Sequence, residues 1–154
     1  MCRNSTAALP QIGGVKKEMP GFTSEEAKLT FESRKILGSP ELRIASTCVR
    51  VPVFYAHSIA IHAEFSAPMS PEQAREILAR TEGVKVIDDL AAAQYPMPLF
   101  TGGGDDVGVG RIRVDPSVEN GLALWCCGDN IRKGAATNAV QILEELAARG
   151  QFDA

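Results

Sequence analysis

The stretch "VGVGRIRVDPSVENGLALWCCGD" (residues 107–129) contains two β-strand patterns separated by a turn. Its two halves, "VGVGRIRVD" (107–115) and "LALWCCGD" (122–129), are rich in apolar residues. The intervening "PSVENG" (116–121) collects Pro, Ser, Asn and Gly, which are the residues that turns favour. The stretch therefore predicts two strands that pair around this turn.

Three segments upstream also have the composition of strands. "LRIASTCVRVPVF" (42–54) is rich in β-branched residues. In "SIAIHAEFSA" (58–67) the apolar positions Ile59, Ile61, Ala63 and Phe65 alternate with Ala60, His62 and Glu64. Both segments therefore predict strands. "VKVI" (84–87) predicts a short strand. In contrast, "YPMPLF" (95–100) predicts extended chain, because we take its two prolines to exclude a helix.

Three segments carry helix signals: residues 23–38, 70–80 and 129–150. In the first, Thr23 and Glu26 have the spacing of a capping box. In the last, Asp129 is placed to cap the helix and Gly150 to end it. Its apolar positions predict one continuous stripe: Ile131, Ala135, Ala139, Ile142, Leu143 and Leu146.

The order of these elements predicts the fold class. Residues 1–22 show no periodicity and form an irregular N-terminal segment, after which helices and strands alternate in groups. This order predicts an α+β fold, with helices on one face of a largely antiparallel or mixed sheet. The 154 residues have the length of one domain, and a hydrophobic content of 45% allows them to bury a core.

Charge and hydropathy argue against nucleic-acid and membrane binding. The net charge is −3, whereas a nucleic-acid interface requires a basic face. No apolar run approaches the roughly 18 residues of a membrane span. Residues 1–22 contain no hydrophobic signal region. We therefore expect a soluble, cytoplasmic protein that binds neither a nucleic acid nor a membrane.

The cysteines do not have the spacing of a metal site. Cys2, Cys48, Cys126 and Cys127 contain no C-x-x-C pair, and only two histidines could join them. We therefore expect no bound metal and reduced, mostly buried thiols. Of the aromatic residues, the single Trp125 lies in a strand pattern and is expected in the core.

The segment "CVRVPVFYAHS" (48–58) places two functional side chains, Arg50 and His57, in an apolar run. In a fully extended chain they would lie about 23 Å apart and on opposite faces. They can share one small ligand only if the chain breaks between them, and Pro52 offers such a break. The alternative is structural: Arg50 reaches water at a sheet edge and His57 begins a loop. His62 lies on the polar face of its strand and is expected to be structural.

Three segments together resemble the C-terminal, substrate-binding and dimerisation half of the aspartate-semialdehyde dehydrogenases. They are "RKILGSPELRIASTCVRVPVFYAHS" (34–58), "GRIRVD" (110–115) and "GLALWCCGDNIRKGAATNAVQI" (121–142), and the resemblance extends over roughly residues 9–148. That family uses NADPH to reduce aspartyl phosphate to aspartate semialdehyde and phosphate, on the route to lysine, threonine and methionine. The resemblance implies a substrate-binding and dimerisation domain over residues 23–128, and a helix over residues 129–150 that packs on a nucleotide domain.

The resemblance also implies roles for single residues. Arg50 matches the arginine that binds the substrate carboxylate, and His57 matches the general acid/base; guanidinium and imidazole groups suit these tasks. Glu25 and Lys28 match a pair that contacts the substrate amine and the phosphate. Asn130 matches an amide that contacts the nicotinamide of NADP. The alternatives are a solvated Glu25–Lys28 surface pair and an ordinary first-turn residue at Asn130.

Other parts of the family's active site have no recognisable counterpart in this sequence. The family has a Gly-rich dinucleotide loop, a phosphate-binding arginine and a nucleophilic cysteine in an Asn-Cys-Ser-Thr element. Here "GGG" (102–104) follows no strand-to-helix transition, and "NST" (4–6) lacks the cysteine, with Cys2 two residues too early. We therefore expect a partial dehydrogenase, inactive as these residues alone. The alternatives are a non-catalytic dimerisation or ligand-binding module, and an inert gene remnant. The resemblance further implies a homodimer that forms through the sheet.

Overall fold

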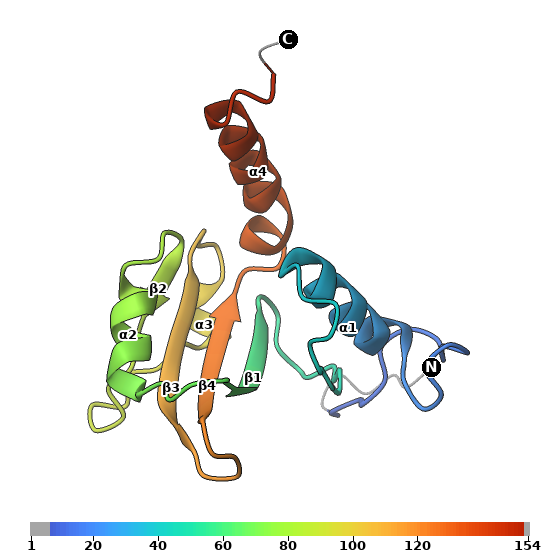
Figure 1. Cartoon of the computed structure of the whole chain (residues 1–154), viewed down its shortest axis with the longest axis horizontal. Helices are drawn as coiled ribbons and strands as arrows, with labels where there is room; N and C mark the ends of the chain where they lie inside the picture. Colours follow the sequence, from blue (N-terminus) through green and yellow to red (C-terminus); the bar gives the residue numbers. More distant parts are fainter. Residues whose placement is uncertain (1–6, 153–154) are drawn as a thin grey trace. The chain divides into compact units, whose positions relative to one another are not determined.

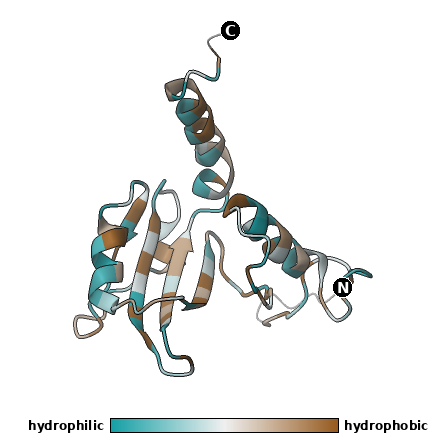
Figure 2. Cartoon of the chain, in the orientation of Figure 1, coloured by the Kyte–Doolittle hydropathy of each residue, from teal (hydrophilic) through white to brown (hydrophobic). Residues whose placement is uncertain are grey.

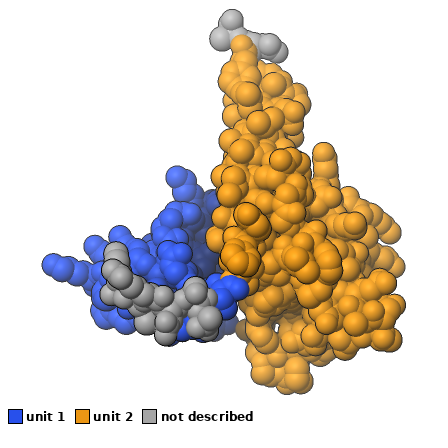
Figure 3. All heavy atoms as spheres, turned by 180° about the vertical axis from the view of Figure 1, so that it is seen from behind, with its two compact units in different colours: residues 1–52 blue, residues 53–154 orange. Residues whose placement is uncertain are grey.

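The structure is a computed structural model that describes residues 7–152. The chain divides into two compact units, one ending at Pro52 and the other beginning at Val53 (Figure 3). The first unit contains one helix, α1, and the second contains a four-stranded sheet and the remaining helices (Figure 1).

Helix α1 (Ser24–Ile36) begins and ends where the sequence predicts. At its N-terminus the backbone N–H of Thr23 donates to Glu26 Oε2 over 2.7 Å, which is one half of a capping box. Gly38 follows the helix with a φ of 61°, a left-handed conformation that glycine adopts at low cost. The buried face of α1 contains Glu26, Ala27 and Thr30.

The strand predicted over residues 42–54 is wrong. Within the first unit this segment forms a single antiparallel bridge, in which Arg50 and Leu9 exchange two backbone hydrogen bonds of 2.9 Å each. In an antiparallel ladder the next backbone donors on this segment would be residues 48 and 52, two positions either side of Arg50, but neither donates to the segment around Leu9. The Cys48 N–H donates instead to the Glu26 side chain, and Pro52 has no N–H to donate.

The second unit contains a sheet with the strand order β1-β4-β3-β2. Strands β3 (Val107–Asp115) and β4 (Gly121–Gly128) form the predicted pair around the turn. Strand β1 (His57–Glu64) adds antiparallel to β4, and β2 (Val84–Val86) adds parallel to β3. The sheet is therefore mixed, and the predicted α+β class is confirmed.

Helix α2 (Pro71–Ala79) covers one face of the sheet over β2 and β3 (Figure 1). Its predicted capping box is present, because Ser70 and Gln73 exchange two hydrogen bonds of 2.9 and 3.2 Å. The core lies beneath this helix and is formed by Ala74, Val109, Ile112 and Leu122, with partly buried apolar neighbours.

The segment 95–101 lies against the opposite face of the sheet. Thr101 Oγ1 donates to Cys127 Sγ over 3.0 Å, and the Trp125 indole N–H donates to the Pro96 carbonyl over 3.0 Å. The prediction of extended chain here is partly wrong, because residues Pro98–Thr101 form a short helix, α3. Pro98 occupies the first helical position, where a proline needs no N–H partner and its fixed φ suits a helix.

The predicted C-terminal helix begins as a π-helix (Arg132–Ala136) and continues as α4 (Thr137–Ala148). Asp105 lies against the π-turn, and its carboxylate accepts hydrogen bonds from both Arg132 and Thr137. These residues are five positions apart, which is the spacing of a π-helical hydrogen bond. Apolar positions recur along α4 (Figure 2), yet none of its residues is buried. Among the described helices, none is long and apolar enough to cross a membrane.

Candidate functional site

Three of the predicted site residues lie in the first unit. Arg50 lies at the bridge to Leu9 with an exposed side chain, while Glu25 and Lys28 lie on the first turns of α1. Lys28 Nζ donates to both Glu25 oxygens, at 3.2 and 3.3 Å, which is the geometry of the solvated surface pair; their contacts to a substrate amine and phosphate stay a prediction. An ion pair this exposed contributes little to stability, which leaves both groups available to a charged ligand.

Glu26 connects these two elements, and its role beyond capping was missed by the sequence analysis. Its side chain is buried, with Oε2 accepting from the Thr23 N–H and Oε1 from the Cys48 N–H at 2.9 Å. These two backbone donors hold the pKa of the Glu26 carboxyl below its usual value. The capping-box spacing indicated the first bond, whereas the second depends on the tertiary fold.

His57 begins β1 and belongs to the second unit. It pairs with Gly128 in the sheet, and its side chain is exposed. The preceding residue, Ala56, has a φ of 67°, a left-handed conformation that is uncommon for a residue with a Cβ. The chain therefore changes direction immediately before His57. Because Arg50 and His57 belong to different units, their predicted meeting at one ligand stays a prediction.

Asn130 follows a buried carboxylate that fixes the local backbone. Asp129 accepts hydrogen bonds from the N–H groups of Gly103, Ile131 and Arg132, at 2.8, 2.8 and 2.9 Å. These bonds, led by that from Gly103, lower the pKa of Asp129. The helix begins later than predicted, with Ile131 and not Asp129 at the capping position, but the Asp129 carboxylate still binds the N–H groups of Ile131 and Arg132 and ties the "GGG" loop to the start of the π-helix. The Asn130 side chain remains exposed.

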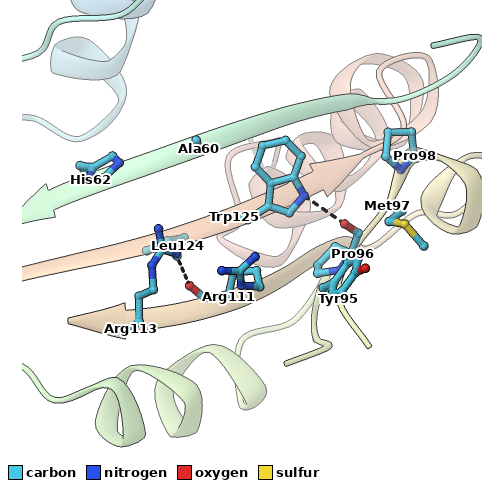
Figure 4. Close-up of a pocket in the computed structure, with 10 residues that line it drawn as sticks. All are labelled: Ala60, His62, Tyr95, Pro96, Met97, Pro98, Arg111, Arg113, Leu124 and Trp125. Atoms are coloured by element: carbon cyan, nitrogen blue, oxygen red, sulfur yellow. Dashed lines mark hydrogen bonds between the residues drawn. The ribbon is translucent and has the colours of Figure 1, made fainter. Parts of the chain in front are cut away.

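A cavity of about 310 Å³ lies on the sheet face opposite α2 (Figure 4). Side chains from β1, β3 and β4 contribute to it, as does the segment 95–98: among others Ala60, His62, Arg111, Arg113, Tyr95 and Trp125. Trp125 is only half-buried, so the expectation that it belongs to the core is wrong. Its ring lies on the opposite face from the core because side chains alternate along β4.

Arg111 reaches this cavity from a β-bulge in β3. The bulge lies between Gly110 and Arg113, and Arg111 has a φ of 54°. The carboxylate of Asp88 accepts from the N–H groups of Arg111 and Ile112, at 2.6 and 3.2 Å, and so stabilises this conformation. Within residues 7–152, no carboxylate pairs with Arg111 or Arg113. β-Bulges commonly redirect a side chain towards a functional surface.

His62 lies beside the same cavity and contacts Asp115. Its Nδ1 donates to Asp115 Oδ2 over 2.7 Å, because an ionised carboxylate can only accept. This bond, together with bonds from the Ser117 side chain and backbone, lowers the pKa of Asp115 to about 2. The predicted structural role of His62 agrees with this contact, which links β1 to the β3–β4 turn.

The described thiols offer no nucleophile of the expected kind. Cys48 and Cys126 are partly buried and Cys127 is buried, and all three are free. Burial raises the pKa of Cys48 and of Cys126, which disfavours their reactive thiolate forms. Cys2 and the "NST" element lie outside the described residues. Within residues 7–152, no group of three or more His, Cys, Asp or Glu side chains is placed to hold a metal ion.

Known proteins resemble this chain in both sequence and fold. The chain is 50% identical over 143 residues to an aspartate-semialdehyde dehydrogenase of Aquifex aeolicus, covering 93% of this chain and 42% of that protein. Its structure superposes with a TM-score of 0.85 on aspartate semialdehyde dehydrogenase II of Vibrio cholerae complexed with ASA, at 43% identity. That match covers 92% of this chain and 41% of the other.

A more distant structure carries the cofactor. Aspartate semialdehyde dehydrogenase with NADP from Candida albicans matches with a TM-score of 0.72 at 25% identity, covering 93% of this chain and 49% of the other. The chain thus spans less than half the length of these relatives. A sequence profile for the semialdehyde dehydrogenase dimerisation domain matches residues 5–133. The chain therefore belongs to the semialdehyde dehydrogenase dimerisation domain family, and it corresponds to the C-terminal half of the aspartate-semialdehyde dehydrogenases.

Proposed function

We propose that this chain forms the substrate-binding and dimerisation part of an NADP-dependent, phosphorylating aspartate-semialdehyde dehydrogenase. The enzyme would reduce aspartyl phosphate to aspartate semialdehyde in the cytoplasm, for lysine, threonine and methionine biosynthesis. The observation that carries this proposal is the first unit, in which Arg50, Glu25 and Lys28 lie on segments joined by one carboxylate. All three match the family's substrate-binding motifs, and the family membership supports the match.

Each residue would have a distinct task. The Arg50 guanidinium would hold the substrate carboxylate with two parallel donors. Glu25 would accept from the substrate amine, and Lys28 would attract the phosphate; both charges are already present at the surface of α1. His57 would transfer a proton to and from the reacting groups, since an imidazole can do both near neutral pH.

The cofactor would meet only a small part of its site in these residues. Asn130 has an exposed amide that fits the carboxamide of nicotinamide. The glycine loop at 102–104 does not fit a dinucleotide, because it follows α3 and the Gly103 N–H is already bonded to Asp129. The described residues thus fit a single contact to NADP, and we derive no hydride-transfer step from them.

The dimer would form through the sheet face opposite α2. That face exposes the cavity around Trp125, together with the guanidinium groups of Arg111 and Arg113, neither of which forms an ion pair with a carboxylate of residues 7–152; Arg113 donates instead to the Arg111 carbonyl. An aromatic residue beside arginines is typical of the central contacts of protein interfaces. The second occupant would be another copy of this chain, because the family is one of dimerisation domains.

The C-terminal helix would pack on a nucleotide domain in the complete enzyme. Ile142 and Leu143 are 53% and 55% exposed, and they belong to the predicted apolar stripe. Exposed apolar patches of this kind mark interaction sites. Residues 23–128 would then be the substrate-binding and dimerisation domain, and residues 129–150 the connection to the cofactor-binding part.

Calorimetry with aspartate semialdehyde and the purified 154-residue chain tests this function. We expect saturable binding that Arg50→Ala weakens about tenfold or more, since charge-assisted hydrogen bonds contribute roughly 1.5–3 kcal/mol. Arg80→Ala, on the exposed surface of α2, should bind as the wild type does. We expect no NADP-dependent turnover, because the sequence has no Asn-Cys-Ser-Thr element.

The outcomes separate the candidate functions. Binding without turnover supports the substrate-binding part of a dehydrogenase, or a ligand-binding module derived from one. Turnover that disappears in Cys2→Ser would show that Cys2 is the nucleophile, and would overturn the assignment as an inactive part. If the chain dimerises but does not bind aspartate semialdehyde, the result supports the alternative of a non-catalytic dimerisation module.

A further inference from the structure

The first unit holds its proposed substrate-binding residues on two different segments. Glu25 and Lys28 belong to α1, whereas Arg50 belongs to an irregular segment that forms only one backbone bridge. Such a segment has few bonds to fix its position, because no ladder supports it. A small ligand that contacts all three side chains requires them to be held within a fraction of an ångström.

One side chain joins these segments. The Glu26 carboxylate receives the Thr23 N–H at 2.7 Å from the start of α1 and the Cys48 N–H at 2.9 Å from the Arg50 segment. Glu26 is only 6% exposed, so water competes little for either bond. Two residues beyond Cys48, the backbone of Arg50 is fixed on its other side by Leu9.

We propose that Glu26 is a positioning residue, which holds Arg50 in register with Glu25 and Lys28 so that one substrate can contact all three. This inference rests on the proposed function, since it concerns the same substrate-binding residues. It assigns to Glu26 a role that its neighbours cannot share. Glu25 points its carboxylate to Lys28, and Glu32 is exposed further along the helix.

The chemistry of the site requires a carboxylate. A carboxylate has two oxygens and can accept from both N–H groups, each with its own oxygen, as observed. A glutamine has the same length but one accepting oxygen, and its NH₂ group would face a second donor. An aspartate has both oxygens but is one methylene shorter, so it cannot reach both N–H groups without moving one segment.

Other ionisable groups surround Glu26, and they set the conditions of a test. The Cys48 thiol lies close enough that Glu26 and Glu25 both contribute to raising its pKa, after the larger effect of burial. The charge of Glu25 is itself paired with Lys28. The Cys48 amide is therefore the site at which to read the titration, because Glu26 Oε1 accepts directly from it.

Two variants and one control test the proposal. Glu26→Gln removes one acceptor at constant size, Glu26→Asp shortens the side chain, and Glu32→Gln makes the same chemical change at an exposed position of α1. Amide hydrogen exchange by NMR, on the full 154-residue chain, gives the ligand-free measurement. We expect Cys48 and Arg50 amides to exchange about tenfold faster or more in both Glu26 variants, and unchanged in Glu32→Gln.

Ligand selectivity distinguishes positioning from general damage. The probes are aspartate semialdehyde and 3-aminopropanal, which lacks the carboxylate that Arg50 would bind. If Glu26 positions Arg50, Glu26→Gln should weaken binding of aspartate semialdehyde about tenfold, with little effect on 3-aminopropanal. Equal losses for both probes would indicate an unspecific structural role and overturn the proposal.

The remaining outcomes are also decisive. In the wild type, the Cys48 amide proton shift should titrate with the Glu26 carboxyl, at a midpoint below the usual glutamate range, and it should be flat in Glu26→Gln. If neither the amide exchange nor the titration changes in Glu26→Gln, the proposal that Glu26 fixes the Arg50 segment is refuted. If the wild type binds neither probe, the proposed function fails, while the exchange and titration still decide whether Glu26 fixes the Arg50 segment.

Discussion

The carboxylate of Asp88 binds the backbone N–H of Arg111 at 2.6 Å and so holds a non-glycine residue in a left-handed conformation. Arg75 supports the arrangement, with Nε donating to Asp88 and Nη2 to the Ile112 carbonyl, at 2.8 and 2.6 Å. A strained residue with this much support is typical of a functional position. Its side chain lies beside Trp125 on the sheet face proposed for dimerisation (Figure 4).

Reversing the charge of Arg111 should weaken the dimer. Arg111→Glu reverses the charge of a guanidinium that pairs with no carboxylate of residues 7–152, so any complementary charge it meets on the second subunit would be replaced by repulsion. We expect the dissociation constant from sedimentation equilibrium to rise about tenfold or more, which corresponds to roughly 1.4 kcal/mol. The matched control is Arg80→Glu on α2, which is on the other face of the sheet. An equal effect of both variants, or none from Arg111→Glu, would show that this face is not the interface.

Replacing Leu143 and Leu146 with glutamine should reduce aggregation of the isolated chain. These leucines are 55% and 38% exposed on α4, and covering such a side chain is worth roughly 1.5–3 kcal/mol. Light scattering at increasing concentration should show less self-association for the double variant, with the dimer unchanged. Scattering equal to that of the wild type would mean that the chain does not aggregate through α4.

The start of the C-terminal helix should lose stability in acid because of Asp105. Its bonds to Arg132 and Thr137 lower its pKa from 3.8 to about 2, with the Arg132 bond contributing most. A lowered folded-state pKa gives stability that is present above pH 3.8 and is lost as the pH falls towards 2. Thermal melts by circular dichroism between pH 6 and 2 should show this decline.

The same melts with Asp105→Asn provide the comparison. Without the titrating carboxyl, the decline over this pH range should be shallower, and the variant should be less stable at pH 6. Asp115 has a similarly low pKa and remains in both proteins, so only the difference between the curves reports on Asp105. Parallel curves would contradict the assignment.

Truncating Leu122 should destabilise the second unit most among its leucines. Leu122 is 1% exposed and belongs to the core under α2, so Leu122→Ala creates a cavity and costs about 2–5 kcal/mol. Leu99→Ala removes the same atoms at 80% exposure and should cost little. Urea denaturation followed by Trp125 fluorescence measures both, and similar midpoints for the two variants would place the core elsewhere.

Local sequence patterns were sufficient for most of the regular elements and insufficient for the site. The capping residues of α1 and α2 and the β3–β4 pair were predicted because their signals lie within a few residues. The strand over 42–54 was wrongly predicted, since the N–H of Cys48 bonds to Glu26, 22 positions away in sequence. No local pattern contains that contact. The positions of Arg50, Glu25 and Lys28 on linked segments follow from it.

The π-turn at Arg132–Ala136 sets how the following helix, α4, is rotated about its own axis. Each residue of an α-helix advances it by about 100°, so a turn that holds one extra residue rotates the rest of α4 by that angle relative to a continuous α-helix. The π-turn, against which Asp105 bonds both Arg132 and Thr137, therefore sets the direction in which Ile142 and Leu146 point. Deleting one residue from this turn would leave the composition of α4 intact while turning its apolar stripe away from its present direction.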